Sequence, residues 1–322
     1  LSHIKVGVFD NDGVMRGKYL SRSKFFSALD SGFAFCDVVL GWDVKDQLYD
    51  NAQYTGWHTG YPDAPVRVLP HTCRDLPFEN GMLLFICEFA EAAEKVCPRG
   101  TLRRVVERCK TMGFDAFAAL EYEFFMFDET PESARAKGFR DLKPFTPDWF
   151  GYSMIRNSVH AELYHEILEM AERMDFPIEG LHTETGPGVL EAAIAYDRAA
   201  DAADKGALFK TFMKVLAQRN GLMATFMAKW SGKYPGQSGH IHVSLRDLAS
   251  GKSAFYDPSQ AHNMSKIQRH FLAGQQRLMP EFLCMVAPTL NSYRRMIPGF
   301  WAPTDATWGV ENRTAALRVI PG

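Results

Sequence analysis

The spacing of apolar residues along the chain changes from strand-like to helix-like. Ile4–Val8 and Val14–Lys18 are extended segments around the Asp10–Gly13 turn, which predicts a hairpin. Apolar and aromatic stretches predict further strands at residues 82–88, 121–127 and 222–227. Apolar residues at helical spacing predict helices over about residues 101–112, 160–173, 205–219 and 265–279.

Two composition changes divide this pattern. Residues 47–75 are rich in glycine, proline, aspartate, tyrosine and histidine, which predicts a long surface loop. At Pro98–Gly100 a region of strands and loops gives way to one in which helices alternate with short strands. We therefore expect one domain over residues 1–96 and a second over residues 97–322.

Composition narrows the class of protein. The 322 residues are 46% hydrophobic and 23% charged, as in a soluble globular chain with a large core. A net charge of -2 leaves no basic footprint for nucleic acid or an anionic membrane. The apolar runs are too short to cross a bilayer, no secretory leader opens the chain, and the six cysteines form no CxxC pair. We expect a cytoplasmic protein with reduced, buried thiols.

The strand predicted at residues 121–127 carries the first candidate chemistry. Side chains two residues apart on a strand share a face, so Glu121 and Glu123 lie side by side. Neighbouring carboxylates among apolar residues repel each other and lose hydration unless a cation compensates. Two glutamates of this kind, with no other candidate ligand near them, more often lie on a solvated face.

Two later stretches repeat the arrangement. A Gly186–Gly188 turn returns the chain, so Glu184 and Glu191 are expected to meet on adjoining strands. Strand alternation places His240 and His242 on one face. Four carboxylates and one imidazole form an oxygen-rich site that suits Mg²⁺ or Mn²⁺ better than zinc, with room for more than one ion.

Arginines follow near the end of the chain. Arg295, Arg313 and Arg318 can each bind a carboxylate or phosphate through a planar guanidinium group. Active sites in which metal ions face arginines are typical of phosphoryl-transfer enzymes. In these enzymes positioning and charge neutralisation supply most of the catalysis. The alternative is that such arginines make surface ion pairs.

These motifs together resemble the glutamine synthetase family. The similar segments are ExEFF at residues 121–125, E-x-GPG-x-x-E at 184–191, SG-H-x-H-x-S at 238–244, YRR-x-x-PG at 293–299 and NRTAALR at 312–318. They follow the family's order across nearly the whole chain. The resemblance implies an α+β fold: a small β-grasp N-terminal domain and a catalytic domain with a curved antiparallel sheet flanked by helices.

The resemblance also assigns roles to single residues. One metal ion would be held by Glu123, Glu184 and Glu191, and another by Glu121 and His240. Arg295 would grip the substrate carboxylate, and Arg313 and Arg318 would face the phosphates. His242 and Ser244 would line the ATP site, and Asp43 would act as a base in a neighbouring subunit's site. The last role implies a homo-oligomer, with stacked hexameric rings as the expected form.

Three departures from the family pattern refine the expectation. The chain ends before the family's R-x-E-x-R segment, so part of the catalytic domain is expected to be missing. The loop at residues 234–239, with Gly236 as a candidate substrate contact, lacks the asparagine of the ammonia-using enzymes. After Pro298–Gly299 come Phe300 and Trp301, and Trp301 stands where those enzymes carry an acidic residue. An indole suits an organic amine better than ammonium.

The sequence therefore predicts an ATP-dependent ligase that joins the γ-carboxylate of glutamate to an organic amine, nearest in character to the γ-glutamylpolyamine synthetases. One alternative is a glutamine synthetase that uses ammonia. Others are an inactive structural relative and a metal-dependent hydrolase. A last alternative concerns the register, with Trp301 in the core and Phe300 facing the site.

Overall fold

The computed structural model describes residues 1–321. The chain forms two compact units. The first comprises residues 1–109, 165–178 and 199–212, and the second comprises residues 110–164, 179–198 and 213 onward. The domain boundary expected at residue 97 stays a prediction.

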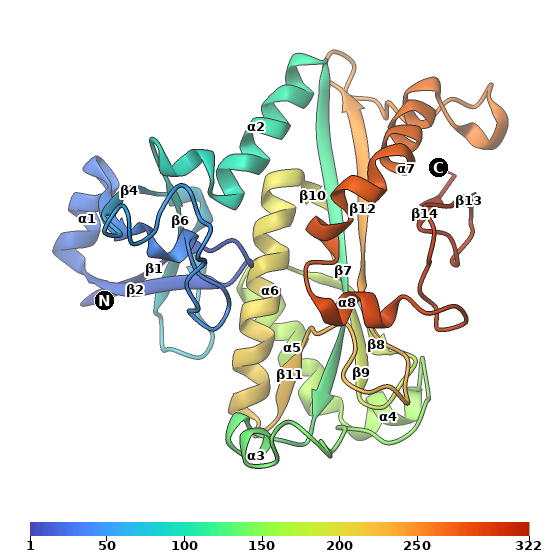
Figure 1. The fold of residues 1–322 in the computed structure, drawn as a ribbon, viewed down its shortest axis with the longest axis horizontal. Coiled ribbons are helices and arrows are strands. Elements are labelled where there is room, and N and C mark those ends of the chain that lie inside the picture. Colours follow the sequence, from blue (N-terminus) through green and yellow to red (C-terminus); the bar gives the residue numbers. More distant parts are fainter. Residues whose placement is uncertain (322) are drawn as a thin grey trace. The chain divides into compact units, whose positions relative to one another are not determined.

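The first unit contains a six-stranded sheet with the order β2-β1-β6-β4-β3, and β5 pairs with β6 (Figure 1). Its elements are β1 (His3–Phe9), β2 (Met15–Ser21), α1 (Arg22–Ser31), β3 (Phe33–Cys36), β4 (Asp63–Val68), β5 (Arg74–Asp75) and β6 (Leu83–Phe89), with short 3-10 turns at Asp37–Leu40, Pro70–Thr72 and Ala93–Lys95. β1 and β2 pair antiparallel, which confirms the hairpin predicted around Asp10–Gly13. α1 packs its buried Phe25 and Ala28 into the core beneath the sheet.

Two sequence expectations for this unit are wrong. Residues 47–75 are no continuous loop, because β4 and β5 lie within them. In β4 the buried residues Ala64, Val66 and Val68 alternate with exposed ones, a strand pattern hidden by proline and charged neighbours. The helix α1 was also missed. Its signals are the Ser21 side chain, which accepts a hydrogen bond from the Lys24 N–H, and Gly32 at φ 71° after its last turn.

The second unit is built on the long strand β7 (Phe114–Phe127) (Figure 1). β12 (Gly239–Asp247) and β11 (Met223–Thr225) pair along one edge of β7, and β9 (Val189–Ile194) and β10 (Asp197–Arg198) pair along the other. β8 (Ile178–Thr183) lies beyond β9. All pairs with β7 are antiparallel, as expected for this sheet. A separate pair, β13 (Trp308–Val310) and β14 (Leu317–Val319), is parallel.

Within residues 97–321, four helices lie where the sequence predicted them, although their lengths differ, and three short helices were not predicted. These helices are α2 (Pro98–Thr111), α3 (Pro131–Ala136), α4 (Met154–Val159), α5 (Ala161–Arg173), α6 (Ala199–Arg219), α7 (Lys266–Val286) and α8 (Leu290–Arg295), with a 3-10 turn at Ala261–Asn263. α6 begins six residues before the expected Lys205, because its first turns are alanine-rich and favour helix without an amphipathic period. α7 continues past Pro280, where the sequence predicted its end.

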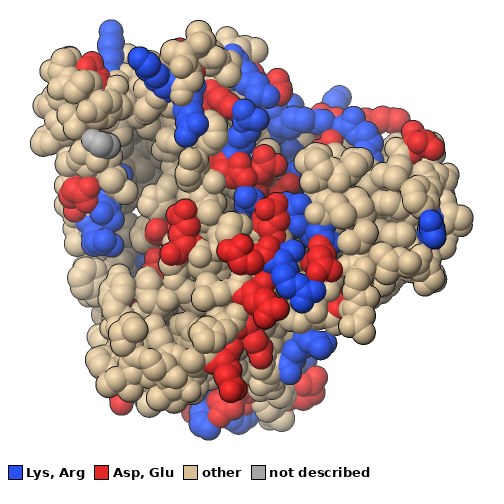
Figure 2. Space-filling model, turned by 180° about the vertical axis from the view of Figure 1, so that it is seen from behind, with Lys and Arg blue, Asp and Glu red and all other residues tan. Residues whose placement is uncertain are grey.

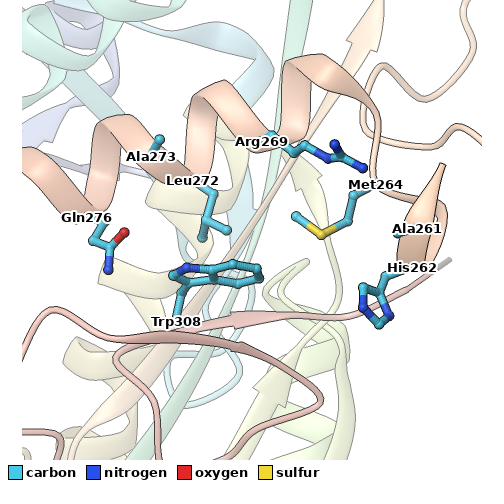
Figure 3. A pocket seen from close by; sticks show the side chains of 8 residues that line it. All are labelled: Ala261, His262, Met264, Arg269, Leu272, Ala273, Gln276 and Trp308. Carbon is cyan, nitrogen blue, oxygen red and sulfur yellow. The ribbon is translucent and has the colours of Figure 1, made fainter.

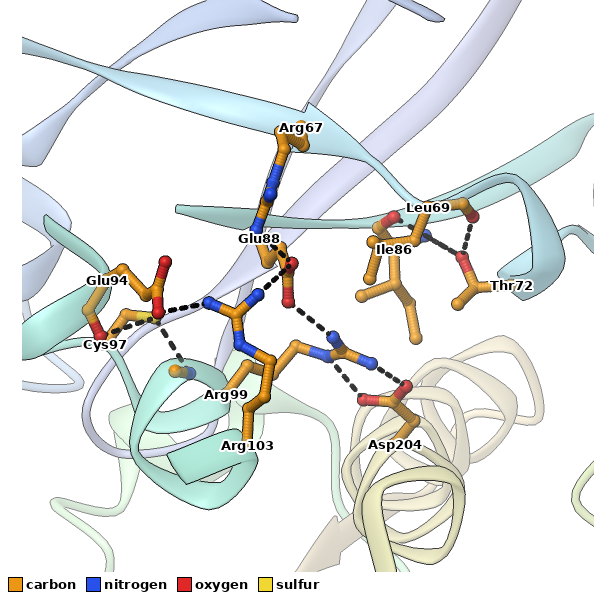
Figure 4. Close-up of polar contacts among 11 residues, drawn as sticks. Arg67, Leu69, Thr72, Ile86, Glu88, Glu94, Cys97, Arg99, Arg103 and Asp204 are labelled. Carbon is orange, nitrogen blue, oxygen red and sulfur yellow. Dashed lines mark hydrogen bonds and ion pairs between the residues drawn. The ribbon is translucent and has the colours of Figure 1, made fainter. Parts of the chain in front are cut away.

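A buried ion-pair network holds part of the first unit together (Figure 4). Arg99 of α2 binds both carboxylate oxygens of Asp204 on α6, at 2.9 and 2.6 Å, and reaches Glu88 of β6 at 3.0 Å. Glu88 also accepts from Arg67 at 2.8 Å and from Arg103 at 3.3 Å. The bidentate contact of Arg99, which is largely buried, holds α2, α6 and β6 together.

The thiols are only partly as expected. Cys87 and Cys97 are buried, whereas Cys73 and Cys284 are exposed. Within residues 1–321, no helix is both long and apolar enough to cross a membrane. On the face shown in Figure 2, lysines and arginines lie beside aspartates and glutamates, so charges of both signs are interspersed.

Candidate active site

Strand β7 brings the predicted acidic residues to one place. Glu121 is the cross-strand partner of Ala193 on β9 and of His240 on β12. Two residues further on, Glu123 is the partner of Glu191 on β9. The following aromatic and apolar residues, Phe124–Phe127, are fully buried, so they anchor the strand that presents both carboxylates.

Glu121 is surrounded by imidazoles. His240 Nδ1 lies 2.9 Å from Glu121 Oε2, and His242 Nε2 lies 3.1 Å from Oε1. The hydrogen bond with His240 and the close contact of the His242 imidazole hold the pKa of Glu121 well below its usual value. The same bond to Glu121 raises the pKa of His240. His242, expected in the nucleotide site, thus also contacts a candidate metal ligand.

Ligand atoms gather in two groups that share one residue. Oxygen and nitrogen atoms of Glu121, Glu191 and His240 all lie within 4.8 Å of one another. The same is true of His182, Glu184 and Glu191. Carboxylates with one imidazole fit a hard divalent ion such as Mg²⁺ or Mn²⁺, and a shared carboxylate suits a pair of ions.

His182 is the member of this site that the sequence analysis missed. It stands on β8, and its Nε2 lies 3.9 Å from Glu191 Oε2. The ring of Tyr152 stacks on it at a centroid distance of 4.4 Å. The available signal was the two-residue spacing from Glu184, which places both side chains on one face of an extended segment.

Two carboxylates in the site resist ionisation. Burial, with the neighbouring charge of Glu123 as the next cause, raises the pKa of Glu191 to about 7. Burial also raises the pKa of Glu123, although the N–H of Ser238, 2.6 Å from Oε2, and the charge of Arg295 oppose that rise. Bringing a cation beside such carboxylates relieves their repulsion, which is the physical argument for a metal site.

Glu123 differs from the other acidic residues in its surroundings. It lies outside both groups of ligand atoms, and Ser238 occupies one of its oxygens. The resemblance assigns it to an ion with Glu184 and Glu191, whereas the structure gathers those two with His182. Its role as a ligand stays a prediction.

The substrate residues expected near Arg295 lie together. A Cβ on Gly236 would come within 2.2 Å of the Ala228 carbonyl oxygen and 2.7 Å of Arg295 Cγ, so only glycine fits there. Arg295 Nη2 donates to the Trp301 carbonyl at 3.4 Å. Trp301 is 69% exposed and Phe300 is half-buried, so the register with Trp301 in the core is wrong.

The remaining candidates are more scattered. Ser244 lies exposed on β12, two residues beyond His242, and Arg313 is exposed in the turn before β14. Arg318 Nη2 pairs with Glu311 at 2.7 Å. In the first unit, Asp43 Oδ1 accepts from the N–H groups of Lys45 and Gln47, at 2.8 and 3.0 Å. These bonds lower the pKa of Asp43, which weakens it as a base.

A cavity of about 430 Å³ lies elsewhere in the second unit (Figure 3). At one end of the cavity, the indole of Trp308 faces Leu272 and Gln276 of α7. Met264 and Arg269 lie toward the other end of the cavity. None of the residues predicted for the site lines this cavity. The carboxylate cluster, not this hollow, carries the candidate chemistry.

Comparisons with known proteins bear on the family of the chain. The family described as "Glutamine synthetase, catalytic domain" matches residues 95–322. Over 99% of its length, the chain is 44% identical to "Type-1 glutamine synthetase 2" of Dictyostelium discoideum, of which it spans 62%. Over 98%, it is 34% identical to "Glutamate–isopropylamine ligase" of a Pseudomonas species, of which it spans 70%.

Solved structures show the same fold. A structure titled "GmaS/ADP complex" aligns with 99% of the chain at a TM-score of 0.83 and 23% identity, and 71% of that protein is covered. This confirms the expected fold class. The family match, the 44% and 34% identities and the order of the motifs agree. The chain belongs to the glutamine synthetase family.

Proposed function

We propose that this protein is an ATP-dependent ligase that joins the γ-carboxylate of glutamate to an organic amine. A carboxylate oxygen attacks the terminal phosphorus of ATP, and ADP leaves. The amine nitrogen then attacks the carbonyl carbon of the acyl phosphate, loses a proton and displaces phosphate. The product is an amide, and each turnover consumes one ATP.

Residues of this chain would divide the work. The groups around Glu121 and Glu191 would hold Mg²⁺ or Mn²⁺, which neutralises phosphate charge when bound. Arg295 would bind the substrate carboxylate, since its Nε has no hydrogen-bond partner within residues 1–321. Arg313, Arg318, His242 and Ser244 would contact ATP. Asp43 would serve the site of a neighbouring subunit, where a changed environment would have to restore its basicity.

The observation that carries the choice of an organic amine is the presentation of Trp301. Its backbone has φ 56°, a left-handed conformation that is an outlier for a bulky residue, and its side chain is 69% exposed. Such strain persists mainly where function uses it. An exposed indole offers a broad apolar face and a cation–π partner to an alkyl- or arylalkylammonium group.

A second candidate is a glutamine synthetase that uses ammonia. The relative with 44% identity carries that name, as does one of Thermus thermophilus with 36% identity over 98% of the chain, and these names favour this candidate. The two functions differ in the second substrate only. Trp301 opposes the ammonia reading, because an indole cannot accept a proton from ammonium.

An acceptor screen separates these functions. ADP release is measured with glutamate fixed and with ammonia, alkylamines, arylalkylamines and polyamines in turn. We expect ammonia to be poor and a bulky amine to be good, with ADP release only when an amine is present. Trp301→Glu should lower activity with bulky amines and raise it with ammonia, whereas Trp57→Glu, at an indole that is 82% exposed in the first unit, should not. Wild-type preference for ammonia would falsify the proposal.

We further propose that the protein works as a homo-oligomer of stacked hexameric rings in the cytoplasm. The support is family membership and the assignment of Asp43 to a neighbour's site. Size-exclusion chromatography with light scattering measures the assembly directly.

A further inference from the structure

Lys229 is a buried cation without a hydrogen-bonding partner. It is 6% exposed, and its Nζ has no hydrogen-bond partner within residues 1–321. A buried ammonium group of this kind is costly unless another interaction replaces its lost hydration. The contact it does make is with an aromatic face: Nζ lies 4.6 Å from the ring centroid of Phe300. Within about 6 Å of a ring centroid, a cation is attracted to the ring face, and the attraction is stronger away from water than at an exposed site.

The backbone of Lys229 is held on both sides. Its N–H donates to Asn291 Oδ1 at 2.5 Å, and its carbonyl accepts from Asn291 Nδ2 at 2.5 Å. The next residue, Trp230, packs edge-on against the buried ring of Phe127 at 5.1 Å. The ammonium group is therefore directed at Phe300 by a rigid support, since α8 and the core of the sheet both anchor it.

The loop that contains Lys229, residues 226–238 between β11 and β12, reaches the candidate metal site. Gln237 N–H donates to the carbonyl of Ala228, and the next residue, Ser238, donates its N–H to Glu123 at 2.6 Å. On the other side, Phe300 directly precedes the strained Trp301. Lys229 thus stands in a continuous series of contacts between a site carboxylate and the turn that exposes the indole.

We propose that Lys229 is a positioning residue for the amine-binding part of the site: by binding the face of Phe300, it fixes the turn that presents Trp301. Phe300 is the internal anchor of this turn, and Trp301 is the external contact. The inference rests on the proposed function, because it assigns the determinant of amine selectivity within that function. Lys229 itself touches no reacting atom.

The test uses four variants of the full protein. Lys229→Met keeps the unbranched stem and removes the charge, Lys229→Arg keeps a cation, and Phe300→Leu removes the ring. The double variant Lys229→Met/Phe300→Leu completes the cycle. Lys233→Met is the matched control, since Lys233 is an exposed lysine of the same loop. The KM and kcat values for a bulky amine, ammonia, glutamate and ATP are measured for each.

We expect Lys229→Met to raise the KM for the bulky amine roughly 10-fold, the range of a desolvated cation–π contact, with little change in kcat or in the KM for glutamate and ATP. Lys229→Arg should restore most of the loss. Phe300→Leu should give the same loss, and the double variant should be no worse than either single variant, because both changes remove one interaction.

Additive losses in the cycle would overturn the proposal. So would a rise in the KM for glutamate or ATP alone, which would show that Lys229 binds an anionic substrate group. A second readout needs no turnover: the fluorescence of Trp301, taken as the difference between each protein and its Trp301→Phe counterpart. Unchanged Trp301 emission and acrylamide quenching in both Lys229→Met and Phe300→Leu would refute the positioning role, even if the protein proves to be no amine ligase.

Discussion

Glu123 on β7 and Glu191 on β9 face each other as cross-strand partners. Like charges directly opposite on a sheet destabilise it, and here burial adds to the repulsion. Burial is the largest cause that raises the pKa of each residue, and at Glu191 the charge of Glu123 adds to the rise. The fold therefore holds an arrangement that is unfavourable on its own and becomes favourable with a divalent cation.

Metal binding should stabilise the protein. At a concentration about 100 times its Kd, Mg²⁺ or Mn²⁺ should raise the free energy of unfolding by roughly 3 kcal/mol, because the ion binds the native state. Glu123→Gln and Glu191→Gln should each abolish activity while the fold stays intact. Melting curves with and without metal measure the stabilisation and show whether each variant folds, and ADP release measures the activity. Glu179→Gln, at an exposed position on β8, is the control. A wild type without a metal-dependent shift would contradict the metal assignment.

Stability without metal should depend on Glu191 between about pH 4.5 and 7. The folded pKa of about 7 exceeds the ordinary value of 4.5, so in this range the folded state holds a proton that the unfolded state releases. The stability that the bound proton of Glu191 contributes is fully present below pH 4.5 and is lost as the pH rises through 7. Its size is roughly 3 kcal/mol.

Denaturant unfolding in EDTA at several pH values checks this dependence. Glu191→Gln should be the more stable protein at pH 8 and should lack this part of the pH dependence. The raised pKa of His240 adds a loss of the same sign; its largest cause, the hydrogen bond to Glu121, is present in both proteins, and the charge of Glu191 is the last of its causes. Parallel curves for the two proteins would refute the assignment to Glu191.

His182 should contribute to metal affinity. Its ring nitrogen lies among the same ligand atoms as Glu184 and Glu191. Whether it binds the ion or only orients Glu191, His182→Asn should weaken Mn²⁺ binding roughly 10- to 100-fold. Titration calorimetry gives the affinity, and His165→Asn, on the exposed side of α5, is the matched control. Equal affinities in both variants would remove His182 from the site.

The ion-pair network of the first unit should be important for stability. Asp204→Asn would remove the carboxylate that Arg99 binds with two hydrogen bonds and leave Glu88 as its charged partner. Hydrogen bonds to charged groups contribute roughly 1.5–3 kcal/mol, so we expect a loss of roughly 2 kcal/mol or more. Denaturant unfolding measures the loss. Asp201→Asn, one turn earlier on α6, should cost less than about 1 kcal/mol. Similar losses in both variants would show that the network adds no more than a surface charge.

The homo-oligomer proposal predicts that subunits share active sites. Inactive Asp43→Ala subunits mixed with inactive Glu123→Gln subunits should partly restore activity, because some mixed sites would contain neither change. Subunit exchange is verified with differently tagged chains. Restored activity would also locate the environment that raises the basicity of Asp43. Complete inactivity after proven exchange would count against the arrangement.

Local sequence patterns predicted the acidic residues and two of the histidines of the candidate site, but they missed His182. The two-residue period of a strand placed Glu121 beside Glu123 and His240 beside His242, and the turn at Gly186–Gly188 implied that Glu184 and Glu191 adjoin. The Asp10–Gly13 turn likewise predicted its hairpin. These features depend on neighbours within a few residues, so the chain itself determines them.

Only the tertiary structure decided which of these components meet. The pairing of Glu123 with Glu191, the approach of His182 to Glu191 and the position of Lys229 over Phe300 join residues that are far apart in sequence or on different strands. Such contacts depend on strand register and on core packing around residues such as Trp230 and Phe127. Neither has a local signature, because a register shift of one residue would turn each side chain to the opposite face.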